Sequence, residues 1–413
     1  MTESKHKFII PLLLFLVFTI SGCKVDESSV EPEEVIPKAA MIYLDQQQQL
    51  IRGFGGVNMP GWIPDMTTDQ VNKAFGTGTG QIGLSILRIR VSYDSNEFGL
   101  EVPTAQKAIS LGATVIASPW TPPAWMKSSN NIVGGILNAN NYQNYAAHLK
   151  SFVNYMNGFG VPIYAVSIQN EPDVSVTYES CSWNYLQMLK FMQDNAPSIG
   201  TKIIMPEVSD FNRTISDAVL SDQAASNNVS IVGGHIYGGG IAPYPLAVLK
   251  GKEVWMTEHL SLDTTWTGAF NTGLEIYDCM NAGMNAYIWW YIRRFYGPID
   301  DNSNVTKRGY VMSQYARFIR PGYYKVNASP NPQDYIYVTA YKSGSKIIIV
   351  AINNDSNSAV SQQFILKNVT ANSFTPYTTT KTKNCVPGNN INSGGGKFTY
   401  TLEKQSITTF VSN

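Results

Sequence analysis

Short apolar runs alternate with helix-like stretches between about residues 51 and 320. The stretch at 142–160, for example, has apolar residues at helical spacing and ends in a Gly-rich segment. Strands that alternate with helices favour a parallel sheet, and eight such units in one domain predict a (β/α)8 TIM barrel over 51–320. The eight predicted strands are 51–58, 86–92, 114–120, 163–171, 202–208, 230–238, 253–259 and 285–292.

The pattern changes after the eighth predicted strand. Residues 321–413 contain alternating or β-branched runs separated by Asn, Ser and Gly turns, which predicts an antiparallel β-sandwich as a C-terminal side domain. The segment 39–50, AAMIYLDQQQQL, precedes the first barrel strand. We expect it to join the side domain as an edge strand.

The N-terminus has the pattern of an export signal. Basic residues precede an apolar run at 8–20, which is too short to cross a bilayer comfortably. The sequence ISGC at 20–23 resembles a bacterial lipobox, so residues 1–23 are interpreted as a lipoprotein signal that ends at a lipidated Cys23. The alternative is an ordinary signal peptide followed by a chance cysteine. The acidic segment 24–38 is typical of a solvated linker.

These features predict an exported bacterial lipoprotein of the outer membrane or cell surface. The lipid anchor would be its sole contact with the membrane, and we expect a monomer.

Composition narrows the classes of partner. The 413 residues include 30 basic and 30 acidic side chains, so no strongly basic face for nucleic acid is expected. Aromatic residues make up 12% of the chain. Rings of this kind stack on sugar C–H faces, although filling a large core would explain them equally well.

Cysteine and histidine spacing matches no metal motif. Cys181, Cys279 and Cys385 remain if Cys23 is lipidated, and they would be structural or inert, with one disulfide as the alternative. The four histidines also lack metal-ligand spacing. We therefore expect no metal and no cofactor.

Polar residues that suit glycoside hydrolysis stand at the carboxyl ends of two predicted strands. The fourth strand ends in Gln169-Asn170-Glu171-Pro172 and the seventh in Thr257-Glu258-His259. Active sites of TIM barrels form at these strand ends, and hydrolysis of a glycosidic bond needs a pair of carboxyl groups. Either motif alone is weak, and two unrelated surface glutamates are the alternative. The combination predicts Glu171 and Glu258 as catalytic.

Other strand ends supply candidate supporting groups. Arg88 could keep Glu258 ionised, and Asn170 could bind a sugar hydroxyl. Tyr237 could orient the nucleophile, and Trp120 could line a sugar cleft. Packing at the top of the barrel would also explain Arg88, Tyr237 and Trp120. His235 and His259 are interpreted as structural.

The segments NEP, TEH, SPWTPPAWM and WWYIRRFYGPID together resemble glycoside hydrolase family 30, most closely its glucuronoxylanase group, subfamily 8. The resemblance runs over about residues 50–413. It implies a (β/α)8 barrel fused to a β-sandwich and retaining hydrolysis of β-1,4-xylan at places set by a glucuronic acid side chain. It also implies that Glu171 is the acid/base and Glu258 the nucleophile.

The same resemblance gives a role to the stretch after the eighth strand. Arg294 would pair with the uronate carboxylate, and Trp290, Tyr291 and Tyr296 would pack around the sugar. A planar guanidinium suits this task because it binds a carboxylate through two parallel hydrogen bonds. Arg293, one residue earlier, would serve structure.

Two positions depart from the pattern of that group. Phe295 replaces a small residue, and Asp263 stands where the group uses a serine hydroxyl on the uronate, unless Ser261 or Thr264 substitutes. Two alternatives to a glucuronate-directed endo-xylanase therefore stay open. One is a family-related xylanase or β-glycosidase that does not depend on the uronate. The other is a non-catalytic glycan-binding surface lipoprotein.

Overall fold

The computed structural model describes residues 1, 38–368 and 371–413. The predicted signal peptide, Cys23 and nearly all of the predicted linker lie outside the described residues. Within the described part, no helix is both long and apolar enough to cross a lipid bilayer.

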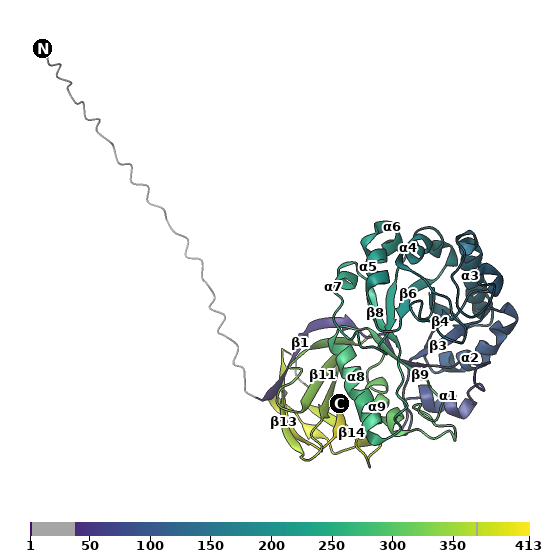
Figure 1. The fold of residues 1–413 in the computed structure, drawn as a ribbon. Coiled ribbons are helices and arrows are strands. Elements are labelled where there is room, and N and C mark those ends of the chain that lie inside the picture. The colour runs from purple at the N-terminus through teal and green to yellow at the C-terminus, as the bar shows by residue number, and fades with distance from the viewer. Residues whose placement is uncertain (2–37, 369–370) are drawn as a thin grey trace. The chain divides into compact units, whose positions relative to one another are not determined.

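Eight parallel strands close into a barrel in chain order, which confirms the predicted TIM barrel (Figure 1). Each of the eight apolar runs forms one strand. The strands are β2 (Gly53–Val57), β3 (Ile86–Val91), β4 (Thr114–Pro119), β5 (Ile163–Ser167), β6 (Lys202–Val208), β7 (Ile231–His235), β8 (Glu253–Glu258) and β9 (Ala286–Tyr291).

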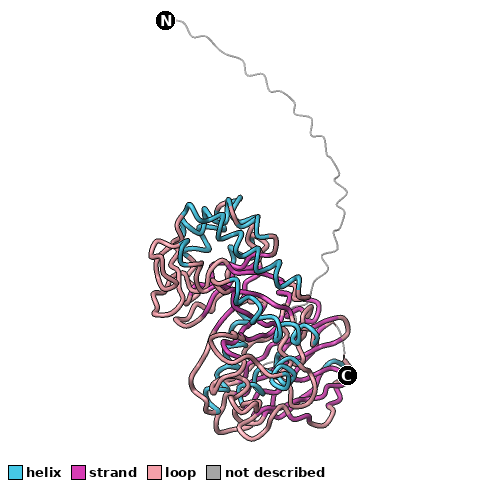
Figure 2. Tube along the Cα trace, turned by 90° about the vertical axis from the view of Figure 1, so that its right-hand side faces the viewer, coloured by secondary structure: helices cyan, strands magenta, loops and turns pink. Residues whose placement is uncertain are grey.

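Barrel strands are apolar along most of their length because both faces are buried. All six residues of β3 and all six of β9 are buried, including Trp289 and Tyr287. Helices lie outside the strands and appear as cyan tubes in Figure 2. The α-helices are α1 (Thr68–Phe75), α2 (Val102–Ser110), α3 (Tyr142–Gly158), α4 (Tyr185–Asp194), α5 (Thr214–Ser221), α6 (Gln223–Asn227), α7 (Pro245–Leu249), α8 (Trp266–Asn281) and α9 (Lys307–Ala316).

The side domain is one continuous, mostly antiparallel sheet of ten strands around its own apolar core. Its C-terminal strands are coloured green to yellow in Figure 1. The strands are β1 (Ala39–Leu50), β10 (Tyr324–Ala328), β11 (Ile336–Ser343), β12 (Lys346–Asn353), β13 (Val360–Lys367), β14 (Ser373–Thr379), β15 (Val386–Pro387), β16 (Ile391–Asn392), β17 (Lys397–Leu402) and β18 (Ser406–Ser412).

The N-terminal strand β1 belongs to this sheet but does not lie at its edge. It pairs antiparallel with β10 and parallel with β13, so the expectation of an edge strand was wrong. The first six residues, Ala39–Leu44, are apolar apart from the tyrosine hydroxyl and almost all buried, which suits a strand with a neighbour on each side. The polar second half, from Asp45 to Gln49, is more exposed.

Helices α8 and α9 join the barrel to the side sheet. Thr409 of β18 donates a hydrogen bond to the carbonyl of Gln314 (2.6 Å), and the Gln314 side chain donates to Thr379 of β14 (2.7 Å). These three side chains are buried, so the two parts form one packed unit. Cys181, Cys279 and Cys385 are free thiols and buried.

Candidate active site

Glu258, the last residue of β8, is almost fully buried and is held at both carboxylate oxygens. Oε2 accepts a hydrogen bond from Nη1 of Arg88 at 2.7 Å, and Oε1 accepts one from the Tyr237 hydroxyl, also at 2.7 Å. Burial, together with the Glu258 charge, raises the pKa of Tyr237, so the phenol remains a donor. The two hydrogen bonds fix the orientation of the carboxylate.

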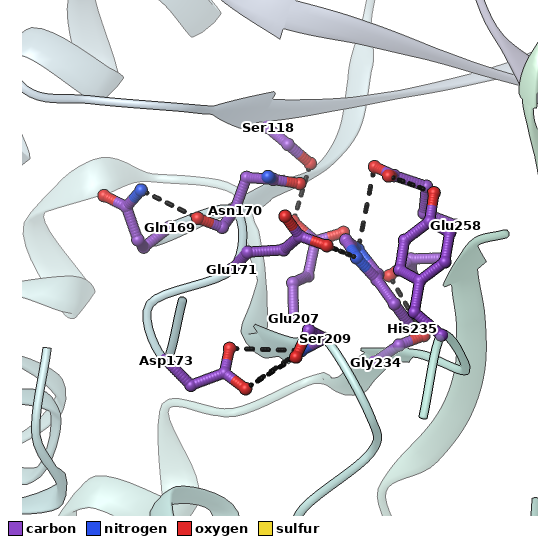
Figure 3. A network of polar contacts seen from close by, with 12 residues as sticks. Ser118, Gln169, Asn170, Glu171, Asp173, Glu207, Ser209, Gly234, His235 and Glu258 are labelled. Carbon is purple, nitrogen blue, oxygen red and sulfur yellow. Dashed lines mark hydrogen bonds and ion pairs between the residues drawn. The ribbon is translucent and has the colours of Figure 1, made fainter. Parts of the chain in front are cut away.

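Glu171 follows β5 and faces Glu258 across His235, as Figure 3 shows. Its Oε1 lies 3.0 Å from Nδ1 of His235, and the other ring nitrogen lies 3.9 Å from Oε2 of Glu258. Ligating atoms of the three side chains all lie within 4.8 Å of one another. The two carboxyl groups are therefore close enough to act on opposite sides of one bond.

The backbone at Glu171 is held in a conformation that non-glycine residues seldom adopt. Its φ is +45°, and that of Glu207 in β6 is +54°. The Glu171 N–H donates to the carbonyl of Glu207 (3.0 Å), and the Asn170 N–H donates to the carbonyl of Pro119 (2.8 Å). Hydrogen bonds to β4 and β6 thus hold the strained turn, and strain of this kind gathers at functional sites.

Arg88 forms the centre of a polar floor beneath the two glutamates. Besides Glu258 it contacts Ser118 (3.0 Å), the Asn170 side-chain oxygen (2.7 Å) and Glu207 (3.2 Å). Burial alone would lower the pKa of Arg88, but the carboxylates of Glu207 and Glu258 outweigh burial and raise it. The guanidinium is therefore held as a positive charge beside Glu258 and Glu207.

Glu207 is a buried carboxylate that the sequence analysis missed. It accepts a hydrogen bond from Ser118 at 2.7 Å, and it is fully buried. Burial would raise its pKa, but Arg88 and His235 outweigh burial and lower it. The one signal in the sequence was a glutamate inside the otherwise apolar run KIIMPEV, where an unpaired charge would be costly.

His235 also has a larger part than its structural interpretation implied. Burial lowers its pKa, but the charges of Glu258 and Glu171 outweigh burial and hold the pKa above its ordinary value. One imidazole therefore lies between the two carboxyl groups, and both of them favour its charged form. His259, in contrast, pairs with Glu275 (2.8 Å).

Glu171, His235 and Glu258 also form the one group in the described chain with the proximity to hold a metal ion. The two oxygens of Glu258 are already engaged by Arg88 and Tyr237. A guanidinium 2.7 Å from a ligand oxygen would repel a metal cation. The charge of Arg88 therefore disfavours a metal ion at this place and favours a site in which the side chains themselves transfer protons or attack the substrate.

A cleft of about 420 Å³ opens above the two glutamates. Aromatic rings form a connected wall: Trp120 lies 5.6 Å from Trp62 and 5.8 Å from Trp290, and Trp290 lies 4.5 Å from Tyr291 between ring centres. The cleft is lined by Trp62, Trp120, Glu171, Tyr178, Tyr237, Glu258, Leu260, Trp290 and Tyr291. A narrow cleft with aromatic walls and paired carboxyl groups suits a sugar chain.

The two arginines after β9 differ in their contacts. Arg293 donates to the carbonyl of Pro64 (2.7 Å) and pairs with Asp301 (3.0 Å), which agrees with the structural role predicted for it. Arg294 is partly exposed and adjoins Tyr296: burial raises the pKa of Tyr296 to about 12 against the opposing charge of Arg294. No carboxylate of the described residues lies within ion-pair distance of Arg294.

Asp263 and Phe295, the two departures from the glucuronoxylanase pattern, are both exposed. The Asp263 carboxylate accepts the backbone N–H of Thr265 (2.8 Å) just before α8. Hydrogen bonds to Thr265 lower its pKa, so the group stays charged. The Asp263 carboxylate therefore stabilises the turn that leads into α8.

Comparisons with known proteins agree on one family. The family model for the glycosyl hydrolase family 30 TIM-barrel domain matches residues 87–208. The chain is 42% identical over 387 residues to the glucuronoxylanase XynC of Bacillus subtilis strain 168, which covers 90% of this chain and 91% of that protein.

Solved structures agree. A family 30 subfamily 8 xylanase, Xyn30A from Clostridium acetobutylicum, superposes with a TM-score of 0.87 at 38% identity, over 91% of this chain and 100% of that one. A family 30 endoxylanase from Clostridium papyrosolvens C71 gives 0.84 with the same identity and coverage.

The chain belongs to glycoside hydrolase family 30. It is therefore a glycoside hydrolase, and the fold class and family predicted from the sequence are confirmed.

Within this family 30 barrel, the structure brings most of the predicted site residues together. Seven of them line the cleft or its floor: Glu171, Glu258, Trp120, Trp290, Tyr291 and Tyr237 above, with Arg88 below. Asn170 contacts Arg88 and therefore belongs to the floor. Tyr296 and Arg294, in the loop after β9, do not line the cleft but are close enough to Tyr291 in its wall to shift the pKa of that residue. Trp62 and Tyr178, two further rings of the wall, were missed because they stand in loops without a sequence pattern.

Proposed function

We propose that this family 30 enzyme is a retaining endo-β-1,4-xylanase that acts on glucuronoxylan and is directed to its cleavage sites by the (methyl)glucuronic acid side chain. The names of its relatives support this substrate: one is a glucuronoxylanase at 42% identity, and two are clostridial xylanases. The observation that carries the mechanism is the separation of at most 4.8 Å between oxygens of Glu171 and Glu258.

That separation favours a retaining mechanism. Retaining enzymes place their two carboxyl groups about 5–5.5 Å apart, whereas inverting enzymes leave room for a water molecule between them. Glu258, ionised beside Arg88, attacks the anomeric carbon. Glu171 gives its proton to the leaving oxygen, so the glycosidic bond breaks as the ester bond to Glu258 forms.

The second half-reaction returns both groups to their starting state. The carboxylate of Glu171 removes a proton from water. The water oxygen attacks the anomeric carbon, and the ester bond to Glu258 breaks. The negative charge returns to the Glu258 carboxylate as the ester breaks. The hydrogen bonds that Tyr237 and Arg88 already donate to this carboxylate stabilise the charge.

Arg294 is proposed to bind the uronate carboxylate, with Trp290, Tyr291 and Tyr296 around the sugar. Its support is a guanidinium on the loop after β9 that has no carboxylate partner within the described residues. A charge-assisted contact of this kind contributes about 1.5–3 kcal/mol.

A xylanase that ignores the uronate is the second candidate. The exposed and charged Asp263 favours it, because a carboxylate close to a uronate would repel it.

Export as a lipoprotein anchored at Cys23 remains part of the proposal. The lipobox-like segment at 20–23 and the apolar run before it support it. A Cys23→Ala variant should move from the membrane fraction to the soluble fraction of the producing cell.

Product analysis tests the proposed function. The purified enzyme would digest glucuronoxylan and an unsubstituted linear xylan side by side, with products weighed by mass spectrometry and the new reducing ends followed by NMR. We expect β-anomers first, one uronate on every product from glucuronoxylan, and little cleavage of linear xylan. Equal cleavage of both into neutral products would overturn uronate direction, and α-anomers would overturn retention.

A further inference from the structure

A second hollow of about 410 Å³ lies between the loops that follow β3 and β4. Both loops leave the carboxyl ends of barrel strands, which is the face that carries Glu171 and Glu258. Its lining residues are Tyr93, Asp94, Ser95, Pro123, Ala124, Trp125, Met126 and His148. Nothing in the proposed catalytic cycle uses this hollow.

The hollow connects to the active-site cleft through stacked groups. Trp62, in the wall of the cleft, lies 5.8 Å from the guanidinium carbon of Arg90, measured from the ring centre. The same guanidinium carbon lies 5.8 Å from the ring centre of Tyr93, which lines the hollow. Glu97 (3.1 Å) and Glu179 (2.6 Å) hold Arg90, so the connection is fixed.

Trp125, in the wall of this hollow, is unusually exposed for a large aromatic residue. Its side chain is 60% exposed, although the residues around it in the chain are anchored. Met126 is buried and donates its N–H to Pro123, and Lys127 is buried with its ammonium on the carbonyl of Ser180 (2.6 Å). A rigid loop that keeps one large ring in water forgoes the free energy of burying it.

The chemistry of the hollow indicates a neutral sugar. Trp125 and Tyr93 supply flat apolar faces. Asp94 uses Oδ1 to accept from Asn96 (2.9 Å), and within the described chain Oδ2 is left to accept from a hydroxyl group. Burial lowers the pKa of His148, so its ring is uncharged. A wall with one carboxylate and no cation of its own would repel a uronate.

We propose that this hollow is a distal subsite that binds unsubstituted xylose residues of the same polysaccharide chain, with Trp125 as its stacking platform. The inference rests on the proposed function and extends it. The cleft would then recognise a pattern: a decorated xylose near Arg294 and bare xylose near Trp125. Polymeric substrate would span both places, whereas a short oligosaccharide would fill the central cleft alone.

The test compares Trp125→Ala with wild-type enzyme on two substrates. One is polymeric glucuronoxylan, and the other is a xylotetraose that carries one methylglucuronic acid. We expect the KM for the polymer to rise about 3- to 10-fold with kcat unchanged, because one aromatic platform is lost. Kinetics on the short substrate should not change, and Trp125→Phe should retain most of the wild-type KM.

Phe159→Ala is the matched control. Phe159 is an exposed ring that follows α3. We expect no change in KM from this variant. An unchanged KM for the polymer in Trp125→Ala would overturn the subsite, and so would an equal rise for both substrates or for the control. Wild-type enzyme that leaves glucuronoxylan uncut would overturn the proposed function itself, before any variant is compared.

Discussion

Two arginines on the same face of the barrel have opposite surroundings. Arg88 is fully buried and contacts Ser118, Asn170, Glu207 and Glu258. Arg294 is partly exposed on a loop and has no carboxylate partner among the described residues. The first arginine is held by the protein, whereas the second is available to a ligand.

In the proposed function, this difference separates the groups that carry out the chemistry from the groups that set specificity. The floor is built on strand ends and on backbone that neighbouring strands hold, so its charges keep their places through the reaction. The loop after β9 can vary without disturbing them. Changes in the floor should therefore reduce the rate on every substrate, and changes in the loop should alter the choice among substrates.

The largest effect should come from Glu258, the proposed nucleophile. Glu258→Gln keeps the size of the side chain and one acceptor oxygen but cannot form the ester, so kcat on glucuronoxylan should fall by at least about 10⁴-fold. Glu253→Gln, at the opposite end of the same strand, should retain activity. Residual activity above a tenth of wild type in Glu258→Gln would mean that another group attacks the sugar.

Glu207→Gln should have the next largest effect on kcat, because it removes the charge of a buried partner of Arg88. Breaking a buried ion pair costs about 3 kcal/mol, and a displaced floor should lower kcat about 100-fold with little change in KM. Urea unfolding and steady-state kinetics would measure the two effects. A change in KM alone would assign Glu207 to substrate binding and would contradict its role in holding Arg88 in place.

His235 should make the stability of the floor depend on pH. Its folded-state pKa is raised, so its contribution is fully present below the unfolded value of about 6.5 and is lost as pH rises through the folded pKa. The difference in unfolding free energy between wild type and His235→Gln should therefore shrink from pH 6 to pH 9.

His148 is the contrast for that measurement. Burial lowers the pKa of His148. The difference in unfolding free energy between wild type and His148→Gln should therefore increase as pH rises toward about 6.5. A pH trend of the same sign for both histidines would contradict the charge assigned to His235.

The smallest effect should be that of Asp263 in the loop after β8. Asp263→Ser keeps a side-chain acceptor for Thr265 but removes an exposed charge. The charge of an exposed carboxylate is screened by water, so kcat/KM on glucuronoxylan should rise only about 2- to 5-fold, while kcat/KM on linear xylan is unaffected. A fall in kcat/KM would show that Asp263 assists uronate binding.

Residues of the site differ in how well they could be predicted from the sequence. Glu171 and Glu258 were predictable because their motifs end apolar runs in the fourth and seventh of eight regular units. Glu207 was not, because a glutamate inside a strand gains its meaning from Arg88 and His235, which are far away in the chain. The left-handed φ of Glu171 and Glu207 likewise comes from hydrogen bonds between strands.

The side domain gives a parallel lesson. Its strands were predictable from alternation, but the interior place of β1 was not. Partner choice in a sheet depends on segments distant in sequence, here β10 and β13, rather than on the strand itself.

The most direct test of the division between floor and loop is the selectivity of Arg294→Ala. The quantity to measure is the ratio of kcat/KM on glucuronoxylan to kcat/KM on linear xylan, for this variant and for wild type. We predict that the ratio falls about 10- to 150-fold while kcat/KM on linear xylan stays the same. An unchanged ratio, or an equal loss on both substrates, would contradict it.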